Sequence, residues 1–460
     1  MDFFFDPESI AVIGASADPS KVGYYILRNA VGGFKGKIYA VNPRYDSIMD
    51  VPCYPDVSSI PEPFEMALYF IPARFLPDTI RACAKKGVKG IIIESAGFAE
   101  VGDEGKQLQE ESVQLAREHN IRLWGPNCMG LIDGYKRHVF SFLMSDQVWD
   151  LLKPGNASFI VQSGMLSAGF LLMMLERGGI GISKMCSIGN KCDVQETELL
   201  EYLIHDESTG VIGMYIESIV DPKGFMELAR STRKPIVLLK GGQSPAGAKA
   251  AASHTASMAG NHEILRHAFR QCGIIEVSDV NELMDFVRGF SKTQLLSHDA
   301  GTAIVSFSGA GGIITSDMLY KKGLPVAELT DESLKALEEV FPEWMAPSHP
   351  VDIWPAIEKF GYEKVYSRTI EILKNDPNVD SLIVHLFASR MKLEHIIDLV
   401  SMKDVHGKPV IAWITGNGEK LHTFKRELED VGIPVFEEMT RGVDFLAAYK
   451  KFYFYQASRG

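Results

Sequence analysis

The segment Ser9-Ile-Ala-Val-Ile-Gly-Ala-Ser16 is a short apolar run that ends in glycine and small polar residues. The same pattern recurs along the chain, for example in GIIIESAG (90–97), PIVLLKGG (235–242) and TAIVSFSG (302–309), each followed by a stretch with helical periodicity. Strands that are apolar on both faces and alternate with helices are typical of a parallel sheet covered on both sides. The sequence therefore predicts a doubly wound α/β fold, with ligands at the carboxyl ends of the strands.

The length and composition indicate an ordinary globular protein of several domains. A chain of 460 residues suggests about three domains. With 46% hydrophobic and 23% charged residues, it is neither mostly disordered nor collagen-like nor built of transmembrane helices. The 47 basic and 59 acidic residues leave a net charge of −12, which argues against nonspecific contact with nucleic acid or an anionic membrane.

The cysteines and the first residues predict a cytoplasmic protein. No two of the six cysteines form a CxxC pair, so neither a disulfide framework nor a zinc knuckle is expected: Cys53, Cys83, Cys128, Cys186, Cys192 and Cys272. The N-terminal sequence MDFFFDPESIAVIGAS carries acids where a signal peptide needs basic residues.

Two strand-to-helix turns resemble each other. The stretches 157–175 and 302–319 each contain an apolar strand, a Ser-Gly turn, small residues and then a helix. A helix N-terminus at a strand's carboxyl end presents free N–H groups that can hold phosphate. For one such turn alone, ordinary α/β geometry is an equally good explanation, but two in matched positions favour anion binding.

The turn after the first strand, residues 14–23, has the position of a dinucleotide-binding fingerprint but not its residues. The turn at Gly14 lacks the GxGxxG spacing, and the second strand ends in Val41-Asn42-Pro43-Arg44 with no acid for ribose hydroxyls. This disfavours NAD and suits a nucleotide whose ribose carries a phosphate, as in coenzyme A. The loops 94–97 and 125–128 should converge on the same edge. Cys128 is expected either to be a small buried residue or to lie beside a thiol substrate, with equal weight.

One histidine lies in an unusual context. His254 is near the end of the Gly/Ala-rich stretch 240–257, which we interpret as a mobile loop. A lone histidine is usually structural, but an imidazole on such a loop can carry a phosphoryl group if a carboxylate holds its other nitrogen. Glu217, at the end of an apolar strand, is the candidate carboxylate, although a solvated strand-end acid would look the same.

Together these residues resemble the alpha subunit of the nucleoside-diphosphate-forming acyl-CoA synthetases, the ADP-forming acetyl-CoA synthetase group, relatives of succinyl-CoA synthetase. The likeness covers nearly the whole chain and is most specific in SHTAS (253–257), with support from GPNCMG (125–130), QSG (162–164) and SIGN (187–190). It implies a Rossmann-like CoA-binding domain at 1–135, a flavodoxin-like ligase domain with the phosphohistidine loop at 150–295, and a second flavodoxin-like ligase domain at 300–460.

The resemblance also implies roles for individual residues. His254 would be the phosphorylated histidine and Glu217 its stabilising carboxylate, with Ser187, Gly189 and Asn190 nearby. The phosphate-binding turns would be Gln162, Ser163 and Gly164, and Gly309, Ala310, Gly311 and Gly312. The expected CoA contacts are Gly14, Ala15, Ser16, Lys21, Val22, Gly23, Asn42, Pro43, Arg44, Ser95, Asn127 and Cys128.

The implied reaction is reversible: acyl-CoA, ADP and phosphate give a carboxylic acid, CoA and ATP through an acyl phosphate and phosphohistidine. No stretch looks like an ATP-grasp domain or a Walker loop, so ADP/ATP and Mg²⁺ are expected on an ATP-grasp beta subunit in an alpha2beta2 assembly, with no metal site in this chain. Two positions depart from the family pattern. Ala256 replaces a glycine of SHTGS, and Ser348-His349 replaces the asparagine before Pro350-Val-Asp, which puts the acyl specificity in doubt.

Two alternatives belong to other functional classes. The first is a catalytically inactive CoA-binding regulatory protein, which the joint presence of His254, Glu217 and both glycine turns disfavours. The second is a NAD(P)-dependent oxidoreductase, which the missing acid after the second strand disfavours.

Overall fold

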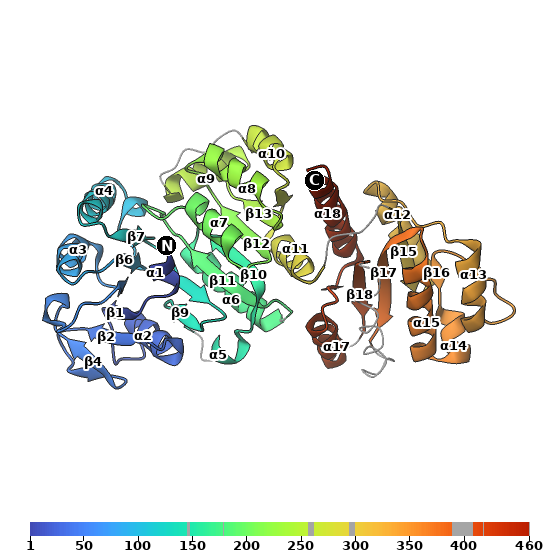
Figure 1. Ribbon diagram of the computed structural model, residues 1–460, viewed down its shortest axis with the longest axis horizontal. Coiled ribbons are helices and arrows are strands. Elements are labelled where there is room, and N and C mark those ends of the chain that lie inside the picture. The colour runs from blue at the N-terminus through green and yellow to red at the C-terminus, as the bar shows by residue number, and fades with distance from the viewer. Residues whose placement is uncertain are drawn as a thin grey trace. The chain divides into compact units, whose positions relative to one another are not determined.

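The structure, a computed structural model, describes residues 1–144, 148–177, 179–255, 262–293, 300–388, 408–416 and 418–459. The side chains of residues 150–151, 174–177 and 252–255 are outside this description. The chain forms two compact units, Met1–Leu283 and Met284–Gly460, and its described residues form three sheets (Figure 1). The first unit holds two of the sheets and the second unit holds one.

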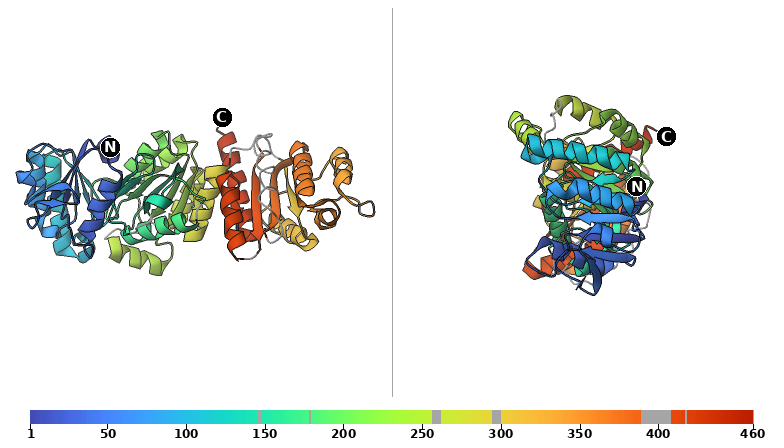
Figure 2. Two further views of the ribbon diagram at one scale, coloured as in Figure 1. Left: turned by 90° about the horizontal axis from the view of Figure 1, so that it is seen from below. Right: turned by 90° about the vertical axis from the view of Figure 1, so that its left-hand side faces the viewer.

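The first sheet has the order β3-β4-β2-β1-β5-β6-β7, and its strands pair in parallel except at β3. Its six parallel strands follow the 3-2-1-4-5-6 order of the Rossmann fold. The strands are β1 (Ser9–Ile13), β2 (Lys37–Val41), β3 (Ser47–Ile48), β4 (Val51–Tyr54), β5 (Met66–Tyr69), β6 (Gly90–Ile93) and β7 (Arg122–Trp124). The helices are α1 (Asp2–Phe5), α2 (Val22–Gly33), α3 (Leu76–Lys85) and α4 (Asp103–Glu118), and α3 and α4 pack side by side (Figure 2).

The second sheet has the order β14-β13-β12-β10-β11-β8-β9. Strands β10 to β14 are parallel in the 2-1-3-4-5 order of flavodoxin-like folds, and the antiparallel pair β8–β9 extends the β11 edge. The strands are β8 (Leu131–Asp133), β9 (His138–Phe140), β10 (Pro154–Val161), β11 (Ile182–Ser187), β12 (Val211–Ile216), β13 (Ile236–Lys240) and β14 (Ile275–Val277). The helices are α5 (Val148–Leu151), α6 (Gly164–Arg177), α7 (Glu196–His205), α8 (Pro222–Ser231), α9 (Pro245–Thr255) and α10 (His262–Gln271). Helix α11 (Val280–Lys292) follows, and it begins in the first unit and continues into the second.

The third sheet is entirely parallel, in the order β16-β15-β17-β18-β19, which again is flavodoxin-like. Its strands are β15 (Gly301–Ser306), β16 (Val351–Asp352), β17 (Val379–Phe387), β18 (Val410–Thr415) and β19 (Val435–Phe436). Its helices are α12 (Gly309–Lys321), α13 (Asp331–Leu337), α14 (Trp354–Phe360), α15 (Tyr362–Asn375), α17 (Gly418–Asp430) and α18 (Met439–Ala457). The predicted fold class is confirmed in all three sheets.

The first two sheets share one apolar core. The short helix α1 connects them, because the Phe4 and Phe5 rings lie 5.3 and 5.9 Å from Trp124 of the first sheet, and Phe5 stacks on Tyr202 of α7 at 4.1 Å. Burying three aromatic side chains at this joint stabilises it by several kcal/mol, at roughly 1.5–3 kcal/mol for a large apolar side chain.

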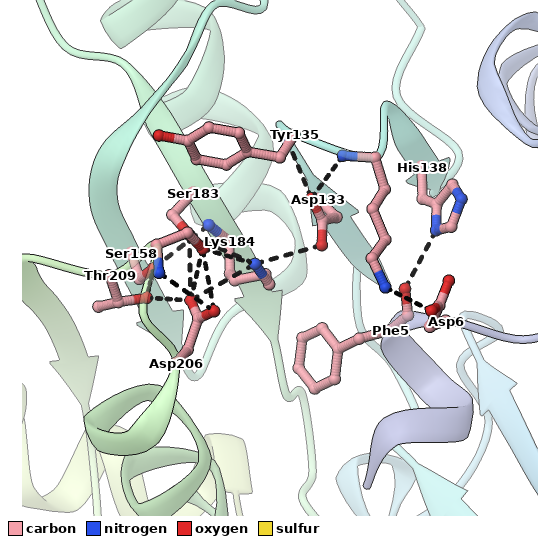
Figure 3. Close-up of polar contacts among 12 residues, drawn as sticks. Phe5, Asp6, Asp133, Tyr135, His138, Ser158, Ser183, Lys184, Asp206 and Thr209 are labelled. Atoms are coloured by element: carbon pink, nitrogen blue, oxygen red, sulfur yellow. Dashed lines mark hydrogen bonds and ion pairs between the residues drawn. The ribbon is translucent and has the colours of Figure 1, made fainter.

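A buried polar cluster anchors the β8–β9 hairpin to the second sheet (Figure 3). Lys184 of β11 pairs with Asp133 of β8 at 3.2 Å and with Asp206 at 3.4 Å. Asp206 also accepts hydrogen bonds from Thr209 and Ser208. Strand β8 also pairs with β11, so residues 131–140 belong to the second sheet, whereas the predicted first domain extends to residue 135.

Helix α9 replaces part of the predicted loop. Residues 245–255 are helical, because Pro245 begins the helix, the Ser244 hydroxyl accepts the Gly247 N–H at 3.0 Å, and the alanines that follow favour helix. The interpretation of 240–257 as a mobile loop is therefore wrong for 245–255, and residues 256–261, with Ala256, are outside the description.

Two further observations concern all the residues that the structure describes, and the helices that they form. None of its helices is long and apolar enough to span a membrane. Within the same residues, no group of three or more His, Cys, Asp or Glu side chains is arranged to hold a metal ion.

Candidate functional site

The turn between β1 and α2 brings strand and helix into close contact. Gly14 has φ +96°, and its N–H donates to the Val41 carbonyl at 3.0 Å. A Cβ on Gly23 would lie 2.0 Å from the Gly14 carbonyl oxygen, so only glycine permits this approach. Lys21 occupies the N-cap position of α2 without a capping side-chain hydrogen bond. Backbone N–H groups in the first turn of α2 are therefore available to an anion.

The end of β2 joins this turn. The Asn42 amide donates to the Ala15 carbonyl at 2.7 Å and accepts the Arg44 N–H at 3.0 Å. Arg44 and Lys21 are both exposed. This part of the chain thus carries two exposed cations, and no acid directly follows β2.

The two other loops of the first sheet converge as expected. The Asn127 N–H donates to the Ser95 carbonyl at 3.0 Å, and the Cys128 thiol contacts the Ile93 carbonyl at 3.4 Å. Burial raises the pKa of Cys128 well above its usual range, so the thiol stays protonated and is unsuited to act as a nucleophile. Cys128 is buried and lines the site cavity described below, and its position beside a thiol substrate stays a prediction.

Two buried polar atoms at this edge have no hydrogen-bond partner among the described residues: the Ser95 hydroxyl and Glu94 Oε1. The other Glu94 oxygen accepts the Phe142 N–H at 2.8 Å. Because burial outweighs this hydrogen bond, the pKa of Glu94 lies well above its usual value. Unsatisfied buried polar groups beside a cavity are typical of a ligand site.

At the second sheet, Gln162-Ser163-Gly164 forms the turn into α6. The Gln162 side-chain oxygen accepts the N–H groups of Glu217 and Ser218 at 2.9 and 3.2 Å. The Ser163 hydroxyl accepts the Leu166 N–H at 3.3 Å, as a helix N-cap does. The Gln162 side chain thus holds the strand end that carries Glu217, while the α6 N-terminus faces the cavity.

Glu217 is 7% exposed and lies among polar partners. The Tyr215 hydroxyl donates to its Oε1 at 3.2 Å. The ammonium group of Lys240 donates to the Glu217 carbonyl, and that of Lys191 donates to the Ser218 carbonyl, both at 2.6 Å. Burial lowers the pKa of both lysines. The shift is opposed at Lys191 first by its ion pair with Glu196 at 2.8 Å, and at Lys240 by the nearby Glu217 carboxylate.

A cavity of about 380 Å³ joins the two sheets at this edge. Glu94, Asn127 and Cys128 line it from the first sheet, and Gln162, Ser163 and Gly164 line it from the second. A Cβ on Gly164 would lie 3.4 Å from the carbonyl carbon of Cys128, so the two loops are in direct contact. The SIGN segment packs here too, because the Asn190 N–H donates to the Pro126 carbonyl at 2.9 Å and Ser187 accepts the Met129 N–H at 2.9 Å.

Three predicted positions are placed less fully. His254 belongs to the last turn of α9, and its side chain is outside the description. The turn 309–312 belongs to the second unit, where Ser308 caps α12 and a Cβ on Gly309 would lie 3.0 Å from Asp352 Oδ2. In the same unit the His349 ring accepts the Ile304 N–H at 2.8 Å, so this departure from the family pattern has a structural role in β15.

Sequence reasoning missed part of the cavity wall. Phe70, Phe142 and Met165 make most of its lining apolar, and Glu94 supplies the buried carboxyl. Glu94 belongs to the loop 94–97 that was predicted to reach this edge, but no role was predicted for its carboxyl group, although it follows an apolar strand just as Glu217 does. Phe142 and Met165 carried no signal, because apolar residues beside a strand or in a helix are usually core.

The comparisons with known proteins agree with this geometry. Residues 8–133 match the family described as "CoA binding domain", and residues 154–290 match "Succinyl-CoA ligase like flavodoxin domain". The chain is 37% identical over 445 residues to the alpha subunit of ADP-forming acetate–CoA ligase II of Pyrococcus furiosus, covering 95% of this chain and 94% of that one. The chain belongs to the family of ADP-forming acyl-CoA ligases.

Other members differ in length. ADP-forming acetate–CoA ligase II of Archaeoglobus fulgidus is 37% identical over 458 residues, which are 98% of this chain but 66% of that protein. A solved structure of the acetyl-CoA synthetase 1 of Ca. Korarchaeum cryptofilum, in complex with phosphate and ADP, has a TM-score of 0.89 at 30% identity and covers 99% of this chain and 97% of that one. Membership of this ligase family confirms the predicted acid–thiol ligase class, and nothing in these matches supports the inactive alternative.

Proposed function

We propose that this ligase-family chain is the alpha component of an NDP-forming acyl-CoA synthetase. It would catalyse, with a partner, the reversible conversion of acyl-CoA, ADP and phosphate into a carboxylic acid, CoA and ATP. One observation carries the proposal: a single cavity is lined both by the 127–128 loop and by the turn into α6. A thioester held at the first loop would therefore lie beside a phosphate held at the second.

The first sheet suits CoA. The buried Ser95 hydroxyl has no hydrogen-bond partner among the described residues, so it could bond to CoA. The exposed Lys21 and Arg44 provide positive charge near the β1–α2 turn. The apolar wall of Val22 and Phe70 suits an uncharged thiol-bearing arm. We assign CoA contact to this edge, with the diphosphate at the β1–α2 turn and the reacting end beside Asn127 and Cys128.

The second sheet suits phosphate chemistry. The N–H groups at the start of α6 would stabilise an oxygen of phosphate as it attacks the thioester carbon and the C–S bond breaks. An imidazole nitrogen of His254 would then attack phosphorus, the P–O bond to the acyl group would break, and the carboxylate would leave. Glu217 would stabilise the positive charge that develops on the ring. We propose that the turn 309–312 contributes further N–H groups.

The nucleotide belongs to another part of the assembly in this proposal. Pyrococcus furiosus relatives are named alpha subunits, which implies a second subunit in those enzymes. We propose an ATP-grasp partner that carries ADP or ATP with Mg²⁺ in an alpha2beta2 enzyme. An oxygen of the ADP β-phosphate would take the phosphoryl group from His254, which restores the free imidazole.

The proposal is tested by reconstitution. The chain with an ATP-grasp partner should form ATP from ADP, phosphate and acetyl-CoA, whereas the chain alone should not. Calorimetry on the chain should give tighter binding for CoA than for NADH. The proposal fails if NADH binds more tightly, or if the isolated chain makes ATP at the rate of the mixture.

A further inference from the structure

The strand end that carries Glu217 contains a tyrosine to which neither the sequence motifs nor the resemblance gives a role. Tyr215 lies two residues before Glu217 at the end of β12, so both side chains leave the same face of the strand. The Tyr215 hydroxyl donates to Glu217 Oε1 at 3.2 Å. The pair lies beside Gln162, whose carboxamide also belongs to the cavity wall.

The backbone around Glu217 is held independently of this contact. Gln162 accepts two N–H groups, and Lys240 and Lys191 donate to the carbonyl oxygens of Glu217 and Ser218. These bonds hold backbone groups and do not involve the Glu217 carboxylate. The Tyr215 hydroxyl, in contrast, acts on the carboxylate itself.

The surroundings leave room for this pair. Gly241, directly after β13, faces both partners, and a Cβ there would lie 3.0 Å from the Tyr215 hydroxyl and 3.2 Å from Glu217 Cγ. A larger residue would press the hydroxyl against the carboxylate. The Phe170 ring meets the Tyr215 ring edge-on at 6.5 Å, so the phenol has an apolar neighbour as well.

The Tyr215 hydroxyl stays protonated, so it can always donate a hydrogen bond to Glu217. Burial first, and then the Glu217 carboxylate, raise the pKa of Tyr215 to about 12. The hydroxyl therefore keeps its proton at every pH at which the enzyme could work. A hydrogen bond to a charged acceptor contributes more than one between neutral groups, so it can select one orientation of the carboxylate.

We propose that Tyr215 is a positioning residue for phosphoryl transfer, which orients the Glu217 carboxylate toward the phosphorylated imidazole. The inference rests on the proposed function, because it needs Glu217 to stabilise the histidine. Tyr215 makes no bond with the phosphoryl group and moves no proton in this role. Its loss should therefore slow phosphorylation without changing how the substrates bind.

The test compares Tyr215→Phe with wild type in the full-length chain, with acetyl-CoA and labelled inorganic phosphate as the phosphoryl source. The expected result is an initial rate of phosphoenzyme formation about tenfold lower, as the loss of one charge-assisted hydrogen bond predicts, with unchanged KM for acetyl-CoA. In a Glu217→Gln background the same change should cost less than twofold, because the two residues act as one unit.

The chain offers a matched control. The Tyr39 hydroxyl donates to Glu62 at 2.9 Å in the first sheet, so Tyr39→Phe removes the same kind of bond away from Glu217 and should keep the wild-type rate. The inference is overturned if Tyr215→Phe matches wild type, or if it costs as much in the Glu217→Gln background as in wild type. If Glu217→Gln and His254→Ala both keep the wild-type rate, the proposed function itself is wrong.

Discussion

The surroundings of Glu94 change the pKa of its carboxyl group. It ends β6 with one oxygen on the Phe142 N–H and the other without a partner among the described residues. Desolvation raises the pKa of the carboxyl well above the usual 4.5. The folded chain therefore keeps a proton that the unfolded chain has already lost, and stability falls as pH rises from about 4.5 toward the folded pKa.

Replacing Glu94 by Gln should remove this pH dependence, because the amide keeps the acceptor for Phe142 and cannot ionise. We expect the variant to gain stability relative to wild type as the pH rises from 5 to 8, by roughly 1.4 kcal/mol for each pH unit above the unfolded pKa until the folded pKa is reached. Urea unfolding across that range measures it, with the exposed Glu110→Gln of α4 as control. Parallel curves for Glu94→Gln and wild type would contradict the assignment.

Gln162 marks the limit of prediction at the residue scale. Its position in a strand-to-helix turn was readable from the sequence, and it does line the cavity. Its side chain nevertheless holds the N–H groups of Glu217 and Ser218, which are 55 and 56 positions away in the chain. Whether it also contacts phosphate stays a prediction, because sequence spacing does not reveal which partner a side chain meets.

At the scale of elements, the β8–β9 hairpin depends on a single buried cation. The Lys184 side chain is 6% exposed and faces Asp133 and Asp206. Replacing it by Met should leave two buried carboxylates without their cation and destabilise the first unit by about 3–5 kcal/mol. Chemical unfolding of the full chain measures the loss, and Lys223→Met, at an 86% exposed side chain, is the matched control. Equal stability of the two variants would show that the cluster contributes little.

The sequence predicts that strands exist more easily than it predicts which sheet each strand joins. The long apolar runs predicted parallel strands in all three sheets, and the structure has them. Strands β8 and β9 are only three residues each, too short for a periodic signal, so their membership of the second sheet escaped notice. Helix α9 differs from the predicted loop for another reason: a run of small residues suggests mobility, but alanine is the strongest helix former.

At the scale of the molecule, the fold was predictable because it repeats one physical unit, the apolar strand followed by an amphipathic helix. The site was only partly predictable, since its residues come from separate loops that meet only after folding. The convergence of 94–97 with 125–128 followed from parallel-strand geometry. The contact of Gly164 with Cys128, which joins the two sheets at the cavity, did not, because it depends on how one sheet packs against the next.

The phosphorylated residue tests the account most directly. The full-length chain, incubated with acetyl-CoA and labelled inorganic phosphate, should take up label that survives alkali and is lost in mild acid, as a phosphohistidine does. Peptide mapping should place the label on His254, and His254→Ala should take up none while still binding CoA, because the proposed CoA contacts lie in the first sheet. Label on a serine, an aspartate or another histidine, or undiminished labelling of His254→Ala, would contradict the account.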